Sequence, residues 1–402
     1  MSSANYRIRA VDDLGAIDAS HWDALVERDG GGNPFLRHAY LHALEASGSV
    51  GPDSGWTPQH LTLWRAGAHN GAREEQLVGA VPGYAKEHSY GEYVFDWSWA
   101  EAYQRYGLRY YPKWLVAVPF TPVPGSRLIA ADAAARAELT AALVAAARRS
   151  QQSSLHVLYA PPEQIELLRA EGLLVRKGVQ FHWHNREPQP YADFDEFLAA
   201  LAQPKRKKIR AERRQVREAG VTLERIAGAA ISASDWSFFY LCYRSTYAAH
   251  FSTPYLNLEF FTRLGRSMPD NVMLVLARRG AKRIAASLGV VDDATQSRPR
   301  LYGRYWGAVE DVRCLHFECC YYQMIECAIE RRLAYFEGGA QGAHKLARGL
   351  DPVETYSAHW LAQPQMHAAV AEFLQRETAS LEHAVDELGE HRAFRKAQTD
   401  RP

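Results

Sequence analysis

One short stretch of the sequence concentrates residues that can do chemistry. Residues 335–345 read Tyr-Phe-Glu-Gly-Gly-Ala-Gln-Gly-Ala-His-Lys. The apolar run before Glu337 predicts a short strand, and the glycines after it let backbone amides approach a ligand closely. Glu337, His344 and Lys345 offer a base, an acid and an anion partner. The stretch therefore indicates chemistry on an acyl or phosphate-bearing substrate; the alternative is a plain connection with incidental polar residues.

A second feature is a basic segment that predicts a helix over residues 204–219, with Pro204 at its start and Gly220 after its end. Cations in a first helical turn oppose the helix dipole, so helix stability alone does not explain them. The segment predicts an anion site; the alternative is a solvated face that serves solubility. The candidate anion-binding residues are Lys205, Arg206, Lys208, Arg210 and Arg213.

The charge of the whole chain is concentrated in that segment. Residues 205–217 hold eight basic residues and one acid, a net charge of +7, whereas the 402-residue chain sums to +1 and the remainder therefore to −6. A local positive charge favours one anionic ligand site over a surface that coats nucleic acid. With no paired recognition helix or dimerising heptads, we expect no DNA binding.

Composition predicts a soluble globular protein, with 47% hydrophobic and 23% charged residues. No apolar run reaches the roughly 18 residues of a membrane helix, so we expect no membrane insertion. The first residues lack the hydrophobic segment of a secretory signal. The five cysteines show no metal-ligand spacing, and we expect reduced thiols, no metal and a cytoplasmic location.

The elements that must position these residues alternate between helix and strand in both halves of the chain. This alternation predicts an α/β (α+β) fold, each half a mixed sheet flanked by helices. A chain of this length is expected to form more than one core. The predicted domains are residues 1–190, residues 191–365, which begin with the basic helix, and a helical extension over residues 366–402.

Seven features of the sequence form a recognisable set. They are Phe-Asp-Trp at 95–97, Tyr-Tyr-Pro-Lys at 110–113, Pro-Phe-Thr-Pro at 119–122, Leu-Tyr-Gly-Arg-Tyr-Trp-Gly at 301–307, Leu-His-Phe-Glu-Cys-Cys-Tyr-Tyr-Gln at 315–323, the basic helix, and residues 337–349. Together they resemble a bacterial family of N-acyltransferases described as peptidoglycan biosynthesis/recognition, within the GNAT (acyl-CoA N-acyltransferase-like) superfamily. The resemblance covers roughly residues 30–375.

The family resemblance implies tandem GNAT-like domains and an acyl donor, either acyl-CoA or aminoacyl-tRNA, used as a co-substrate with no permanently bound cofactor. More distantly, residues 337–349 resemble Fem-type aminoacyltransferases, in which a Phe-Lys pair occupies the place of His344-Lys345. The GNAT pyrophosphate loop, Gln/Arg-x-x-Gly-x-Gly/Ala, is only partly matched by residues 304–309, which read as mid-strand.

The resemblance suggests formation of an amide bond, in which a neutral amine attacks, loses its proton, and the developing oxyanion is held. Glu337 is the first candidate for general base or amine anchor, unless it only caps the loop amides that follow it. Lys345 can hold an oxyanion or phosphate, or be a surface lysine, and His344 can relay a proton or be structural. The other candidates for donor or substrate binding are Asp96, Lys113, Arg304, Trp306, His316, Glu318 and Arg348.

Two hypotheses follow from these residues. The first is an N-acyltransferase that joins acyl-CoA or aminoacyl-tRNA to a small-molecule or peptide amine, in cell-wall precursor metabolism. The second is a non-catalytic protein that binds an anionic or peptidoglycan-type ligand on a transferase fold.

Overall fold

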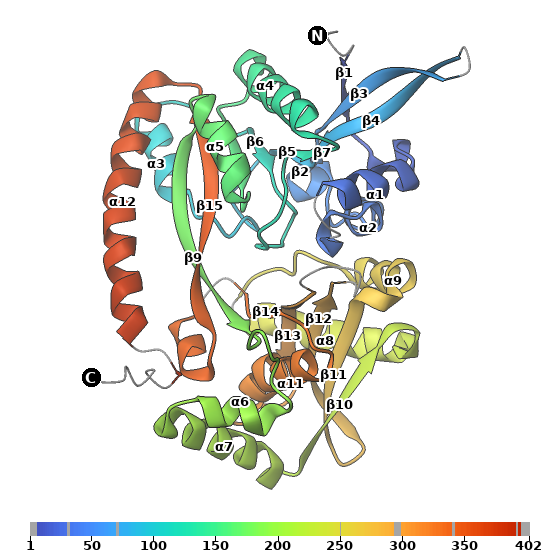
Figure 1. Cartoon of the computed structure of the whole chain (residues 1–402), viewed down its shortest axis with the longest axis vertical. Helices are drawn as coiled ribbons and strands as arrows, with labels where there is room; N and C mark the ends of the chain where they lie inside the picture. Colours follow the sequence, from blue (N-terminus) through green and yellow to red (C-terminus); the bar gives the residue numbers. More distant parts are fainter. Residues whose placement is uncertain are drawn as a thin grey trace. The chain divides into compact units, whose positions relative to one another are not determined.

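The structure is a computed structural model that describes residues 6–29, 33–69, 72–249, 251–292, 299–339, 342–390 and 393–394. The chain divides into two compact units, Met1–Gly178 with Glu354–Glu382, and Val179–Val353 with His383–Pro402 (Figure 1). The division falls inside two long strands, β9 (Leu174–His184) and β15 (Asp351–Leu361). The boundaries predicted from the sequence are instead at residues 190 and 365. The glycine run at residues 30–32 lies outside the described residues.

The first unit contains two sheets. One has the strand order β1-β3-β4-β7, and the other includes the order β15-β8-β6-β5-β2, in which β6 and β8 run parallel. The strands are β1 (Tyr6–Val11), β2 (Trp56–Pro58), β3 (His60–His69), β4 (Ala72–Val81), β5 (Gly83–Lys86), β6 (Lys113–Val116), β7 (Ile129–Ala130) and β8 (Ser154–Leu158). The helices are α1 (Ala19–Arg28), α2 (His38–Ala46), α3 (Trp97–Arg105), α4 (Ala133–Arg149), α5 (Pro162–Ala170) and α12 (Pro364–Glu390).

Apolar side chains on the inner faces of these elements form the core of the first unit. Leu139 and Leu143 of the alanine-rich helix α4 pack with Leu63 and Val157 of the sheets. Helix α4 begins where the Asp132 carboxylate accepts a hydrogen bond from the backbone of Ala135, as expected of an N-cap. Helix α3 and strand β6 lie between residues 90 and 120, where the sequence pattern predicts no helix or strand.

The second unit is built on the strand order β10-β11-β12-β13-β14-β9, in which β13 and β14 run parallel. Its further strands are β10 (Val221–Ala227), β11 (Val272–Arg279), β12 (Lys282–Val291), β13 (Arg300–Ala308) and β14 (Tyr335–Glu337). Its helices are α6 (Phe194–Ala200), α7 (Gln203–Glu218), α8 (Ala233–Ala249), α9 (Leu258–Ser267), α10 (Leu315–Phe317) and α11 (Gln323–Glu330), with a π-helical turn at Glu318–Tyr322 and a 3₁₀ turn at Ala343–Arg348.

Helices α7 and α8 are each held by close packing within this unit. Ile209 and Val216, seven residues apart on the basic helix α7, are buried in the core, so the charges of α7 lie on its other faces. The backbones of α8 and β13 lie very close together. A Cβ atom on Gly307 of β13 would lie 1.7 Å from the carbonyl oxygen of Cys242 on α8. Only glycine permits this approach.

The fold class predicted from the sequence, an α/β (α+β) chain with mixed sheets and flanking helices, is confirmed. Over the described part of the chain, no helix is both long and apolar enough to cross a membrane. The five cysteines form no disulfide, and three of them are buried.

Candidate active site

Glu337 is the last residue of β14 and lies between two neighbouring strands. Tyr302 of β13 and His182 of β9 are its partners in the two ladders. The side chain is only 4% exposed, with Oε1 3.7 Å from Nη1 of Arg300 and Oε2 3.9 Å from Nε2 of His182. Oε2 accepts no hydrogen bond from any described residue. The carboxylate is thus buried but incompletely satisfied, which is costly unless a ligand or proton completes it.

The electrostatic surroundings of Glu337 suit proton transfer near neutral pH. Burial raises the pKa of its carboxyl to about 7, with Arg300 and Arg304 opposing the rise. Burial also lowers the pKa of His182 to about 3, so this imidazole is neutral near pH 7 and does not neutralise the carboxylate. A carboxyl with a pKa near 7 can both take up and release a proton at physiological pH.

Arg304 lies in a β-bulge, two residues beyond the last position of β13 that pairs with β14. On β12, Leu288 pairs with Tyr305 and Gly289 with Gly303, so Arg304 is the extra residue. The β13–β14 pairing ends at Tyr302 and Glu337, while β13 continues to Ala308. Bulges often re-aim a side chain beside an active site. Residues 304–309 were predicted to lie in mid-strand, and the structure confirms this for 304–308, because β13 ends at Ala308.

A pocket of about 260 Å³ lies in the second unit between α8 and β13. It is lined by Tyr243, Thr246, Tyr247, Ser252, Arg304, Tyr305 and Trp306. Two residues predicted for donor binding, Arg304 and Trp306, are therefore brought together in one cavity. The tyrosines were missed, because residues 243–247 read only as part of a helix.

Lys345 is held by the glycine-rich loop itself. Its Nζ donates a 2.7 Å hydrogen bond to the carbonyl oxygen of Gly339, and the side chain is buried. Burial lowers the pKa of its ammonium to about 8. Gly342 has φ of +112°, and a Cβ there would lie 2.4 Å from the ring of His344. Ala340 and Gln341 lie outside the described residues.

An aromatic group borders Lys345. The exposed imidazole of His344 shares a 3.1 Å hydrogen bond with the hydroxyl of Tyr321. The ring centroid of His316 lies 6.5 Å from that of His344 and 5.5 Å from that of Trp306. Burial lowers the pKa of His316 to about 4, which leaves a neutral ring. Trp306, His316, His344 and Lys345, far apart in sequence, therefore gather around one loop.

Three of the predicted binding residues take part in internal ion pairs. Arg348 is buried and donates to both carboxylate oxygens of Glu212 on α7, at 2.9 and 3.0 Å. Arg213 pairs with Glu318 at 3.0 Å and also contacts Glu326. These pairs join α7 to the π-helical turn and to the 3₁₀ turn that carries Lys345, which indicates a positioning role.

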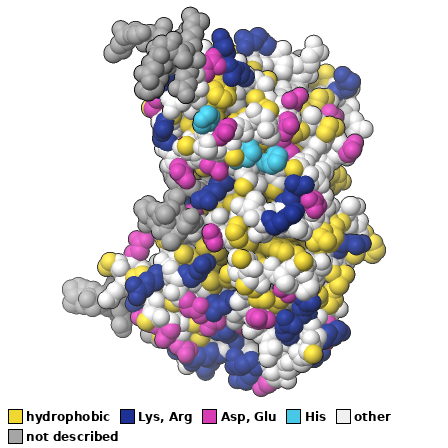
Figure 2. Space-filling model, turned by 90° about the vertical axis from the view of Figure 1, so that its right-hand side faces the viewer, with side chains coloured by type: hydrophobic (Ala, Val, Ile, Leu, Met, Phe, Trp, Pro, Cys, Tyr) yellow, Lys and Arg dark blue, Asp and Glu magenta, His cyan; other side chains and the backbone are white. Residues whose placement is uncertain are grey.

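Other cations of α7 face outward next to this loop. Lys207 and Lys208 are exposed, and Lys205 and Arg206 are half-buried. Burial lowers the pKa of His344, and the charges of Arg348, Lys345 and Lys208 act in the same direction. Arg210 makes only an exposed 3.4 Å contact with Asp195. Figure 2 shows Lys and Arg side chains interspersed with Asp and Glu at the lower end of the view.

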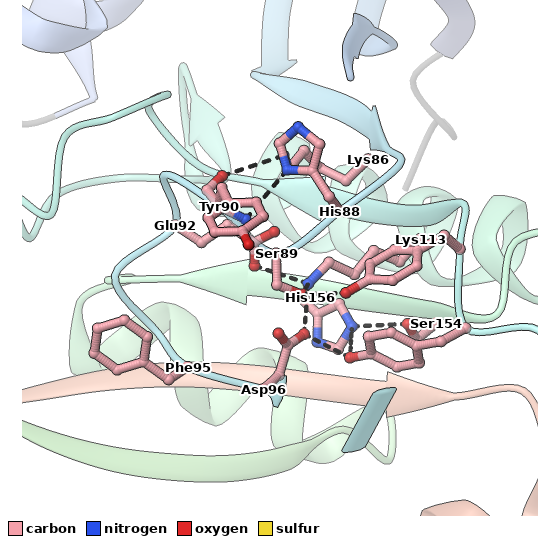
Figure 3. Close-up of polar contacts among 12 residues, drawn as sticks. Lys86, His88, Ser89, Tyr90, Glu92, Phe95, Asp96, Lys113, Ser154 and His156 are labelled. Atoms are coloured by element: carbon pink, nitrogen blue, oxygen red, sulfur yellow. Dashed lines mark hydrogen bonds and ion pairs between the residues drawn. The ribbon is translucent and has the colours of Figure 1, made fainter. Parts of the chain in front are cut away.

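The first unit holds a separate buried network that includes the predicted residues Asp96 and Lys113 (Figure 3). Nζ of the fully buried Lys113 donates to Ser89, to Glu92 at 2.8 Å and to Asp96 at 2.5 Å. Burial would raise the pKa of Asp96, but Lys113 holds it below its usual range. Burial raises the pKa of Glu92 to about 7. All three ammonium protons of Lys113 are used, so a ligand would reach it only if the network opened.

Sequence reasoning missed Glu92 and its neighbour Lys86. Burial lowers the pKa of Lys86 to about 7, and its Nζ lies 3.0 Å from Nδ1 of His88 and 4.1 Å from the ring of Trp56. The sequence feature that could have indicated these two residues is the mixture of acids, lysines and aromatic residues over positions 86–97. It gave no indication of which of them are buried.

Comparison with solved structures supports the fold. The chain is similar to the C-terminal domain (DUF2156) of a putative lysylphosphatidylglycerol synthetase from Agrobacterium fabrum, with 11% identity, a TM-score of 0.52, and coverage of 90% of this chain and 96% of that one. It is also similar to L-PGS from Bacillus licheniformis, with 10% identity, a TM-score of 0.51, and coverage of 89% and 97%. At these identities the likeness concerns the fold alone. No curated protein matches the sequence.

A family model described as peptidoglycan biosynthesis/recognition matches residues 13–396, nearly the whole chain. The family description connects the chain with the biosynthesis or recognition of peptidoglycan. The recognition made from the sequence motifs is thereby confirmed, and the protein belongs to the FemAB-like family.

Proposed function

We propose that this protein is an N-acyltransferase that forms an amide bond between an acyl donor and an amine acceptor, with Glu337 as the general base. The observation that carries the proposal is the buried carboxyl of Glu337. One of its oxygens accepts no hydrogen bond from the described residues, and burial raises its pKa to about 7. A structural cap would have its oxygens satisfied, whereas a base must keep one for the substrate.

The reaction follows from the charges around the loop. An ammonium acceptor loses one proton to the Glu337 carboxylate, and the resulting amine attacks the carbonyl carbon of the donor. The C–N bond forms and the C–S or C–O bond to the carrier breaks. A second proton from the attacking nitrogen passes to the carrier, which leaves as a thiol or hydroxyl, and Glu337 releases the first proton to solvent. Near pH 7 most of Lys345 is charged, because its pKa is about 8, and its ammonium can stabilise the oxyanion.

The donor-binding role belongs to the outward face of α7. This sixteen-residue helix is about 24 Å long, and the charge of its Lys208 acts on His344 of the loop. A stripe of that length is longer than one diphosphate requires and suits a polyanion. We therefore propose aminoacyl-tRNA as the first donor to test and acyl-CoA as the second.

The test measures amide formation by the full chain with radiolabelled aminoacyl-tRNA or acyl-CoA and a set of primary amines. Glu337→Gln should lower the transfer rate by roughly 10²–10⁴-fold with donor affinity retained. The slope of donor affinity against salt separates the carriers, because it scales with the number of phosphates neutralised. If neither donor gives product while binding of a peptidoglycan precursor survives Glu337→Gln and Lys345→Ala, the protein is a non-catalytic binding protein.

A further inference from the structure

Helix α7 is poorly stabilised by its own sequence. Its first turn contains no acid, and its N-cap is Ala202, whose methyl side chain cannot accept a hydrogen bond from that turn. Cations occupy positions 205–208, where positive charge opposes the helix dipole. Cations four residues apart, such as Arg206 and Arg210, or Arg210 and Arg214, also repel one another. An anion on the outward face of α7 offsets this repulsion, so anion binding stabilises the helix.

The inward face of α7 is bound to the turn that carries Lys345. Both carboxylate oxygens of Glu212 accept hydrogen bonds from Nη2 of Arg348, at 2.9 and 3.0 Å, and the carboxylate also accepts one from the hydroxyl of Tyr322. Nη1 of the same guanidinium donates a 2.8 Å hydrogen bond to the carbonyl oxygen of His344, the residue before Lys345. Arg348 thus joins a side chain of α7 to the backbone of the catalytic turn.

This link between helix and turn is buried and geometrically specific. Arg348 is 2% exposed and Glu212 is 7% exposed. The guanidinium carbon lies 3.5 Å from the ring centroid of Phe317, and Nε donates to the hydroxyl of Tyr322 at 3.1 Å. A planar guanidinium holds several acceptors at fixed angles, which a lysine ammonium does not. Separating a buried ion pair leaves an unpaired charge and is costly, so the turn is expected to follow α7.

The turn that Arg348 holds is short and bordered by glycines. It is the 3₁₀ turn Ala343–Arg348, between Gly342 with φ of +112° and Gly349 with φ of +82°. Glycine adopts these conformations without strain, and small residues of this kind are common at hinges. Because Lys345 lies inside the turn, the place of its ammonium depends on how firmly Arg348 holds the end of the turn.

We infer that Arg348 is a positioning residue that couples donor binding on the outward face of α7 to the placement of Lys345. This inference rests on the proposed function, which assigns the donor to α7 and the oxyanion to Lys345. A bound anion stabilises α7, Glu212 then holds Arg348, and Arg348 fixes the turn. By thermodynamic linkage, the ordered turn must in return strengthen donor binding.

Hydrogen–deuterium exchange of the full chain, read by mass spectrometry, tests the coupling with deacylated tRNA and with CoA as probes. The reporters are the amides of Lys345, Gly349 and Leu350, whose backbone hydrogen bonds form the turn. A saturating probe should slow exchange over residues 203–218. In the wild type it should also slow the reporters at least ~5-fold, the lower end of typical coupling between sites. This comparison requires no variant.

Variants at both ends of the link should abolish the effect on the turn alone. Arg348→Lys keeps a charge opposite Glu212, so the chain can fold, but it loses the planar fork. Glu212→Gln keeps the shape of the side chain on α7 and removes its charge. In both variants the probe should still protect residues 203–218 and leave exchange of the reporters unchanged. Arg225→Met, which removes a 2.7 Å ion pair with Glu330 in the same unit, should behave as the wild type.

The outcomes separate this inference from the proposed function. If neither probe slows exchange in α7 of the wild type, or if α7 is protected while the reporters are unchanged, the coupling is overturned even where acyl transfer is observed. Protection of the turn that depends on Arg348 and Glu212 supports the coupling even if no donor yields product, in which case the catalytic proposal alone fails. Where transfer occurs, Arg348→Lys should lower kcat at least ~10-fold, with a smaller rise in the donor KM, because Lys345 is misplaced.

Discussion

The buried carboxyl of Glu337 predicts how stability depends on pH. Its pKa is about 7 in the folded chain and near 4.5 when exposed to water. The folded state therefore binds more protons than the unfolded state between these values, and its stability falls as pH rises through that window. At about 1.4 kcal/mol for each pH unit, the ionised carboxylate costs the fold roughly 3 kcal/mol above pH 7.

Glu337→Gln removes this titration while keeping the shape of the side chain. Relative to the wild type, the variant should gain about 3 kcal/mol of unfolding free energy as the pH is raised from 4.5 to 8.5. The measurement is urea-induced unfolding of both proteins at half-unit pH intervals. Glu218→Gln, an exposed carboxylate on α7, serves as the control. If the difference in unfolding free energy between the wild type and Glu337→Gln stays constant within about 0.5 kcal/mol over this pH range, the assignment of a raised pKa to Glu337 is refuted.

Three more predictions concern other parts of the chain. Lys113→Met leaves two buried carboxylates without their cation and should lower the unfolding free energy by roughly 3–5 kcal/mol, measured by urea titration. Gly307→Ala should lower the melting temperature by several degrees because α8 must move away from β13, whereas Gly51→Ala, with open space around the new methyl, should not. Lys207→Glu with Lys208→Glu should weaken donor binding and reduce its salt slope by about two, with the acceptor KM unchanged.

The elements that carry the site were predictable where local sequence determines them. The strand before Glu337, the mid-strand place of Arg304 and the basic helix all follow from apolar runs, breakers and caps. The helix α3 was not predicted, because its aromatic residues favour strands by propensity and become helical through packing against α12.

The partners of the site residues could not be predicted, because they depend on long-range pairing. Glu337 and Lys345 are eight positions apart, yet their side chains have different partners, Arg300 and His182 for the first and the carbonyl of Gly339 for the second. His182 reaches Glu337 only through the β9–β14 ladder. Charge alone likewise could not show which cations of the basic helix turn inward to form ion pairs.

The central claim is that Glu337 removes the proton of the acceptor amine. The most direct test is the pH dependence of the single-turnover rate of acyl transfer, with saturating donor, in the wild type and in Glu337→Gln. We expect the wild-type rate to rise with pH, with an apparent pKa near 7. We expect Glu337→Gln to be at least ~100-fold slower and to lack this rise with pH, while it binds the donor as tightly as the wild type does. A variant that keeps the wild-type rate and pH profile would contradict it.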